Sequence, residues 1–243
     1  MSELIVPSRF CGPPTSGNGG WTAGALAALL TPHADGEWPT IEVTLRQPPP
    51  LDQPMPVTDG VAVDPSGAPV AEARQVDTDP TPPAYVAPEE AEAASARYPG
   101  LTHHPFPTCF SCGTAREDGL RIFPGPTGDR SVAATWTPRA DLISDYHVYE
   151  DPQPCASLAS TWSAIDCAGG WACDFGPRLM VLGRMTARVH ALPELGHRHV
   201  VVGEKREQSG RKSVAGTALY TEDGTLVASA EQVWISVESA DFA

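Results

Sequence analysis

One carboxylate stands alone in a long run of small and apolar residues. Asp166 is the only charged residue in "CASLASTWSAIDCAGGWA", residues 155–172. If this run forms a helix that a sheet covers, loss of water raises the pKa of the carboxyl group and makes it a candidate base or nucleophile. The alternative is a solvent-exposed Asp in the last helical turn, which the helix dipole disfavours. Ser163 shares its helix face and could orient a water molecule, although most small residues here serve close packing.

The stretch Asn18-Gly19-Gly20-Trp21 opens an alanine- and leucine-rich segment. Adjacent glycines are poor helix formers, so their presence at a helix start needs a reason. A helix N-terminus offers unpaired N–H groups, and glycine lets a carbonyl oxygen approach them, as an oxyanion site requires. Close helix packing is the alternative. We expect Trp21 to line a pocket for an apolar group.

Cys109 and Cys112 form a C-x-x-C pair, with His103 and His104 just upstream. Zinc needs four ligands, and this set could supply two thiolates and one or two imidazoles. A lone C-x-x-C pair is weak evidence, so we expect reduced, metal-free cysteines. A redox pair is disfavoured because no thioredoxin-like pattern surrounds it.

The composition is that of an ordinary globular protein. The chain has 243 residues and a net charge of −14, which disfavours binding to nucleic acid. No apolar run approaches the roughly 20 residues of a membrane span. The start "MSELIVPSRF" lacks the pattern of a signal peptide, so we expect a cytoplasmic protein with six reduced cysteines and no membrane partner.

The same element order occurs twice along the chain. An early helix is expected near 19–31 and a second near 154–168, each followed by strands. The pattern predicts an α+β fold in which antiparallel sheets wrap the two helices. The expected domains are residues 1–85 and 107–243, and the proline-rich residues 86–106 form a linker with a short helix near 88–97. The expected strands are "ELIV", "TIEVTLRQ", the hairpin "VAVDPSGAPVAEARQV", "GLRIFPG", "SVAATWT", "LMVLGRMTARVHAL", "HVVVGEKREQ", "KSVAGTALYT" and "TLVASAEQVWISV".

Several segments together resemble the double-hotdog acyl-CoA thioesterases. "RFCGPPTSGNGGWTAGALAALL" resembles the segment that opens the first central helix, and "CFSCGTAREDGLRIFPG" resembles a segment before the first long strand. "STWSAIDCAGGWA" is similar to the end of the hotdog helix that carries a catalytic acid. "GEKREQSGRKSVAGTALYTEDGTLVASAEQVWI" resembles the last three strands. The resemblance covers nearly the whole chain and implies two fused hotdog domains.

The resemblance implies hydrolysis of an acyl-CoA or related acyl thioester without a metal or redox cofactor, coenzyme A being part of the substrate. Asp166 would be the base or nucleophile, and backbone N–H groups at Asn18–Trp21 would bind the thioester carbonyl across the interface of the two halves. The chain departs from the pattern at its second helix start, Gln153-Pro154-Cys155, which has no glycine. The two halves therefore cannot form equivalent sites. A homodimer of double-hotdog chains fits the same resemblance.

The basic residues Arg206, Arg211 and Lys212 could hold the phosphates of coenzyme A. A solvated hairpin tip is the competing interpretation. Two other functions compete with hydrolysis. One is a non-catalytic acyl-CoA or acyl-carrier binding protein. The other is an enoyl-thioester hydratase or dehydratase, for which His147 is the histidine well placed to act.

Overall fold

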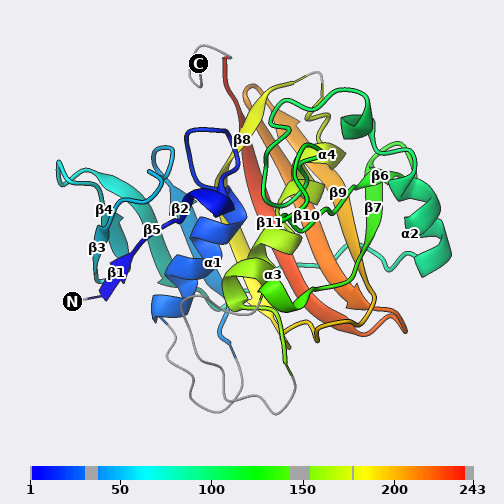
Figure 1. Cartoon of the computed structure of the whole chain (residues 1–243), viewed down its shortest axis with the longest axis horizontal. Helices are drawn as coiled ribbons and strands as arrows, with labels where there is room; N and C mark the ends of the chain where they lie inside the picture. The colour runs from blue at the N-terminus through cyan, green and yellow to red at the C-terminus, as the bar shows by residue number, and fades with distance from the viewer. Residues whose placement is uncertain (1, 31–37, 143–153, 177, 239–243) are drawn as a thin grey trace.

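The computed structural model describes residues 2–30, 38–142, 154–176 and 178–238. Within them, 11 strands form one antiparallel sheet in the order β1-β3-β4-β5-β2-β8-β11-β10-β9-β7-β6 (Figure 1). The strands are β1 (Ser2–Leu4), β2 (Ile41–Leu45), β3 (Met55–Thr58), β4 (Val61–Val63), β5 (Pro69–Gln75), β6 (Gly125–Pro126), β7 (Ser131–Trp136), β8 (Met180–Val189), β9 (His199–Ser209), β10 (Lys212–Thr221) and β11 (Leu226–Ser236). None of the helices in these ranges is long and apolar enough to cross a membrane.

The sheet contains the same arrangement twice. The first half has the order β1-β3-β4-β5-β2, and the second half has the matching order β7-β9-β10-β11-β8, with β6 added at its edge. The halves join where β2 pairs with β8, from Ile41 opposite Ala187 to Thr44 opposite Arg184. The repeated element order read from the sequence is therefore a repeated strand order in space.

The central helices lie on one face of this sheet. They are α1 (Gly19–Leu30), α3 (Leu158–Ala164) and α4 (Cys167–Ala172). The helix α2 (Pro88–Ser95) packs on the other face, where Ala91 joins a cluster with Val200, Val202 and Tyr220. The short 3-10 turns are η1 (Ser8–Phe10), η2 (Pro99–Leu101) and η3 (Ala140–Leu142). Figure 1 shows α1 and α3 side by side across the middle of the sheet. Gly24 permits this closeness, because a Cβ there would lie 2.8 Å from the Cα of Ala159 and 2.7 Å from the Cβ of Trp162. The predicted α+β fold is confirmed.

The second central helix differs from the prediction of one helix over 154–168. It begins at Leu158, because Ser157 caps it by accepting a hydrogen bond from the Ser160 N–H at 3.0 Å. It breaks after Ala164 and resumes as α4, which runs past the predicted end at residue 168. Gln232 donates to the Ile165 carbonyl at 2.7 Å and so satisfies an acceptor that the break frees.

The strand prediction for "GLRIFPG", residues 119–125, is wrong except at its last residue, which begins β6. The N–H groups of Leu120 and Ile122 donate to the carbonyls of Phe110 and Ser111, so this segment pairs with the preceding loop and not with the sheet. Arg121 between them has a φ of 57°, outside the strand region. The short strand β3 was missed, because prolines flank and interrupt it.

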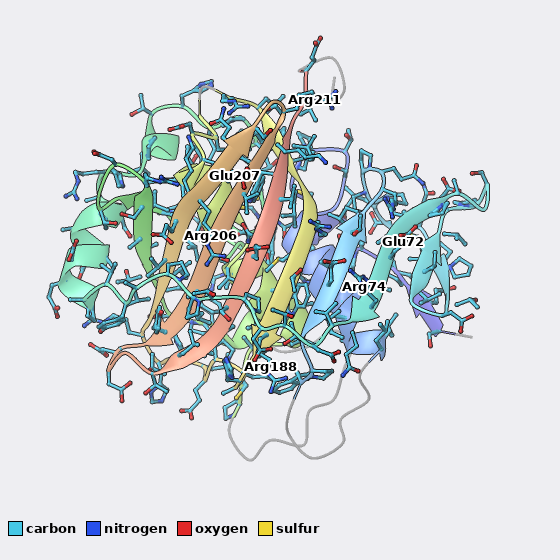
Figure 2. All side chains as sticks on the ribbon, turned by 180° about the vertical axis from the view of Figure 1, so that it is seen from behind. Glu72, Arg74, Arg188, Arg206, Glu207 and Arg211 are labelled. Atoms are coloured by element: carbon cyan, nitrogen blue, oxygen red, sulfur yellow. The ribbon has the colours of Figure 1, made fainter. Side chains whose placement is uncertain are left out.

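The other predicted strands are present, and α2 falls within the helix expected near 88–97. This helix packs on β6, β7 and β9 of the second half. The residues before it cross the outer face of the sheet, where Pro83 accepts a hydrogen bond from the Tyr220 hydroxyl and Pro80 accepts one from Ser229 (Figure 2). The domain boundaries at residues 85 and 107 remain a prediction.

Candidate active site

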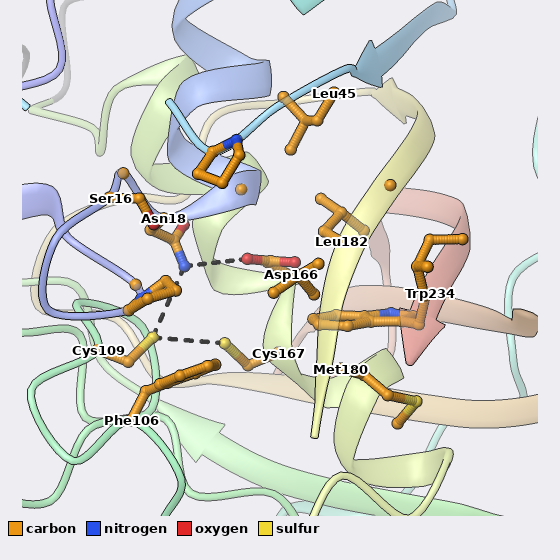
Figure 3. A pocket seen from close by; sticks show the side chains of 18 of the residues that line it. Ser16, Asn18, Leu45, Phe106, Cys109, Asp166, Cys167, Met180, Leu182 and Trp234 are labelled. Atoms are coloured by element: carbon orange, nitrogen blue, oxygen red, sulfur yellow. Dashed lines mark hydrogen bonds between the residues drawn. The ribbon is translucent and has the colours of Figure 1, made fainter. Parts of the chain in front are cut away.

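The break in the second central helix places Asp166 at the centre of the molecule. The residue is the N-cap of α4, and its relative exposure is 2%. An Asp in solvent, the competing interpretation of the sequence, is therefore excluded. The carboxylate faces the start of α1, which comes from the other half of the chain (Figure 3).

Two donors from the first half converge on one carboxylate oxygen of Asp166. The Gly20 N–H and the Asn18 side-chain amide each donate to Oδ2 at 3.0 Å. The other oxygen, Oδ1, is buried and has no hydrogen-bond partner among the described residues. The start of α1 therefore lies within hydrogen-bond reach of Asp166, and one carboxylate oxygen keeps its lone pairs available.

Asn18 is held by three further contacts. Its Oδ1 accepts from the Trp21 N–H at 2.8 Å and from the Ser163 hydroxyl at 3.0 Å, and its backbone carbonyl accepts from the Thr22 hydroxyl at 2.8 Å. The first contact caps α1, and the second ties it to α3. The side-chain amide is therefore fixed with its N–H groups toward Asp166.

Burial controls the acidity of Asp166. Desolvation raises the pKa of its carboxyl group from 3.8 to about 7, against the hydrogen bonds from Gly20 and Asn18, which favour the charged form. The nearby Cys109 thiol adds a smaller rise when it is ionised. The group can thus hold or release a proton near neutral pH.

A cavity of about 440 Å³ opens beside this carboxylate. Both halves line it, and most of its wall is apolar. The wall includes Asn18, Gly19, Leu45, Phe106, Asp166, Met180, Leu182 and Trp234. Figure 3 shows Met180, Leu182 and Trp234 across the cavity from Asn18. A ligand with one polar end and an apolar body fits such a space, because its polar end would meet Asp166 and its body the apolar wall.

Gly19 and Gly20 have different surroundings. Gly19 lines the cavity, and a Cβ there would lie 2.9 Å from the Cβ of Leu182. At Gly20 a Cβ would lie 2.5 Å from the Cβ of Asp166. Close packing therefore accounts for both glycines, since a Cβ at either position would meet a side chain of the other half. The role of the pair in binding a carbonyl remains a prediction.

Two predicted substrate-binding residues lie behind the cavity wall. Trp21 is 1% exposed, stacks on Phe10 with ring centroids 4.1 Å apart, and is not among the residues that line the cavity. Ser163 donates its hydroxyl hydrogen to Asn18, so it positions the amide and is not placed to hold a water in the cavity.

The basic residues are dispersed. Arg206 lies on the outer face of the sheet and pairs with Glu231 at 2.9 Å, away from the cavity face (Figure 2). Arg211 donates to the Ser236 carbonyl at 3.2 Å, and Ile235 and Val237 on either side of Ser236 line the cavity. Lys212 is exposed beside it. Of the three, Arg211 and Lys212 lie near the cavity, and Arg206 does not.

Sequence reasoning missed a third cysteine. Cys167, directly after Asp166, has its sulfur 3.7 Å from that of Cys109. His104 accompanies the cysteines, with Nε2 3.3 Å from the sulfur of Cys112, whereas His103 is exposed. The adjacency of Cys167 to Asp166 was the available signal. His147 and Gln153 lie outside the described residues.

Comparison with solved structures shows what this fold resembles. The tesB protein of Mycobacterium avium subspecies paratuberculosis matches with a TM-score of 0.57 and 16% identity over 97% of this chain and 91% of that one. A hotdog-fold protein of unknown function from Alicyclobacillus acidocaldarius gives 0.62 and 14%, over 97% and 92%. A protein proposed to be a thioesterase II from Thermobifida fusca gives 0.58 and 15%, also over 97% and 92%.

No protein-family model and no curated protein sequence matches the chain. At 14–16% identity the structural likeness shows the fold alone. Since the matches run through nearly the whole chain, that fold comprises both halves of the sheet. The expected arrangement of two fused hotdog units is confirmed.

Proposed function

We propose that the chain hydrolyses an acyl thioester, with an acyl-CoA as the substrate class. The observation that carries the proposal is the position of Asp166. Its carboxylate comes from one half of the chain, meets the start of α1 from the other half, and borders an apolar cavity. Acyl transfer requires a base or nucleophile beside donors for the carbonyl oxygen, and these groups supply both.

The N–H of Gly19 is the donor we assign to the thioester carbonyl. The N–H groups of Gly20, Trp21 and Thr22 already donate to Asp166 or Asn18. Among the described residues, no acceptor is seen for the Gly19 N–H, which lies at the first position of α1 on the cavity wall. The helix dipole adds to its attraction for developing negative charge.

Asp166 would act through Oδ1. This oxygen can take a proton from a water molecule that attacks the carbonyl, or it can attack the carbonyl itself. The tetrahedral intermediate then expels the thiolate of the carrier. On the nucleophilic route this leaves an anhydride between the acyl group and Asp166, which a water molecule hydrolyses to release the acid and restore the carboxylate. Oδ2 stays bound to Asn18 and Gly20, which keep the carboxylate in place during either step.

A panel of acyl-CoA substrates of increasing chain length tests the proposal, with product acid measured by chromatography. We expect turnover by the wild type and a fall on the order of 10² or more for Asp166→Asn, typical of loss of a general base. Asp129→Asn, at an exposed loop position, is the matched control and should keep full activity. Equal rates for the wild type and Asp166→Asn would refute the role of this carboxylate.

The same panel separates the competing functions. A binding protein would retain acyl-CoA without turnover in either form. A hydratase would add water to an enoyl-CoA and leave the thioester intact. A single turnover in ¹⁸O-labelled water distinguishes base from nucleophile, because only the nucleophile can place an unlabelled Asp166 oxygen in the product acid.

A further inference from the structure

Three buried thiols converge on the floor of the cavity. Cys109 and Cys112 come from the loop before β6, and Cys167 is the first residue of α4. Their three sulfur atoms all lie within 4.8 Å of one another, and all three cysteines are free and buried. The proposed hydrolysis does not use them, so their convergence needs its own explanation.

The spacing of the sulfurs suits a tetrahedral metal. With zinc–sulfur bonds of about 2.3 Å, two thiolates on one zinc ion lie about 3.8 Å apart. The sulfurs of Cys109 and Cys167 are 3.7 Å apart. The sulfur of Cys112 lies within 4.8 Å of the other two. A small shift would therefore place the three sulfurs at three corners of a tetrahedron.

The loop that carries two of the thiols forms a tight turn. The Gly113 N–H donates to the Cys109 carbonyl at 2.8 Å, and a Cβ on Gly113 would lie only 2.4 Å from that carbonyl oxygen. Gly113 is therefore needed for this turn, which brings the two thiols of the C-x-x-C pair together.

Further donors face the sulfurs from neighbouring elements. The Asn18 amide lies 3.7 Å from the Cys109 sulfur, and the indole N–H of Trp171 is buried with no hydrogen-bond partner among the described residues. His104 accepts the Phe106 N–H at Nδ1, 3.0 Å away, which leaves its proton on Nε2. The Cys112 carbonyl accepts this proton at 3.1 Å, and the Cys112 sulfur lies 3.3 Å from the same nitrogen. A protonated Nε2 cannot bind a metal, so His104 is not a ligand.

We propose that Cys109, Cys112 and Cys167 bind one zinc ion as three thiolates, with the fourth coordination position facing the cavity. Binding releases the three thiol protons to solvent. All three residues line the cavity, so a water molecule or the ligand can take the fourth position. This proposal replaces the expectation of metal-free cysteines, which considered only the two thiols of the C-x-x-C pair.

The ion would connect two separate segments at the candidate active site. It links the 109–113 loop to the residue directly after Asp166, and the loop in turn contacts Asn18. The metal would thus fix the position of the Asp166 carboxylate relative to the Asn18 amide. This role does not depend on which reaction the cavity catalyses.

Metal analysis of the full chain tests the proposal. The protein is purified under reducing conditions without chelators, and zinc is measured by mass spectrometry. We expect one zinc per chain. Replacement of zinc by Co²⁺ should give thiolate-to-cobalt charge-transfer absorption in the near ultraviolet and the visible bands of a tetrahedral site.

Matched cysteine variants locate the site. Cys109→Ser and Cys167→Ser should lower zinc content from one per chain to near zero and abolish the cobalt spectrum. Cys173→Ser, at a buried thiol outside the cluster, should change neither. If a variant fails to fold, the wild-type cobalt spectrum still decides. Reduced wild-type protein that carries no zinc and gives no thiolate–cobalt absorption would overturn the proposal, as would a disulfide within the cluster in place of metal.

Discussion

Asp166→Asn should stabilise the fold while it removes activity. The wild-type carboxyl group is buried, its pKa is raised to about 7, and Oδ1 has no partner among the described residues. An Asn side chain has the same shape, and its oxygen can keep both hydrogen bonds from Asn18 and Gly20. The variant therefore avoids placing a negative charge in the interior.

The size of the effect follows from the two pKa values. The folded value of about 7 lies about 3 pH units above the ordinary 3.8, a difference worth roughly 4 kcal/mol. Between about pH 4 and pH 7 the folded protein keeps a proton that the unfolded chain has lost, so wild-type stability falls relative to the variant as the pH rises. Below pH 4 this contribution vanishes, and above pH 7 it is complete.

Denaturant unfolding of both proteins at pH 4, 6 and 8, with chelator and reductant present, measures this difference. The stability advantage of Asp166→Asn should grow by roughly 4 kcal/mol between the extremes, equivalent to a rise of about 10 °C in Tm for a chain of this size. The comparison across pH cancels any constant effect of the amide. A difference that does not change with pH, or that shrinks as the pH rises, would refute the reasoning.

Three other changes test the rest of the site. Gly20→Ala places a Cβ 2.5 Å from that of Asp166, so it should lower the unfolding free energy by on the order of 1–3 kcal/mol and also lower turnover. The control Gly176→Ala, whose nearest contact is at 3.6 Å, should leave stability nearly unchanged. Arg211→Ala should raise the KM for acyl-CoA severalfold and leave kcat unchanged, whereas Arg206→Ala on the outer face should change neither constant. Equal effects of the two variants would show that Arg211 does not bind the phosphates of the substrate. Leu182→Ala should enlarge the cavity and shift the preferred acyl chain by one or more carbons toward longer substrates; an unchanged chain-length profile would show that this wall does not contact the chain.

Much of the fold was predictable because the strands alternate and the turns carry strong signals. The long strands β8–β11 and their hairpin turns follow directly from the sequence. Asp166 was predictable because a single carboxylate in an uncharged helix needs a reason. The limits lie where distant residues decide local structure. Gln232 satisfies the carbonyl at the helix break, and the loop at Cys109 takes the backbone bonds of "GLRIFPG".

The basic cluster shows a different limit. Arg206 and Arg211 are close in sequence, but the hairpin that carries them passes from the outer face to the end of β11. Charge density along the chain does not say which face of a sheet a side chain occupies, because alternate residues on a strand point to opposite faces. The convergence of Cys167 with the C-x-x-C pair is likewise a property of the fold.

The repeated strand order has an evolutionary consequence. Two identical subunits related by a two-fold axis must present the same residues twice, so every substitution in their shared interface occurs in both copies. In this fused chain the two central helices differ, because α1 (Gly19–Leu30) carries no charged residue and Asp166 caps α4 in the other half. In a fused chain, one half can carry Asp166 and the other half can carry the helix start whose N–H groups donate to it. A substitution at this site therefore changes one half of the chain without the same change in the other half. We expect one chain to bind one acyl ligand at saturation.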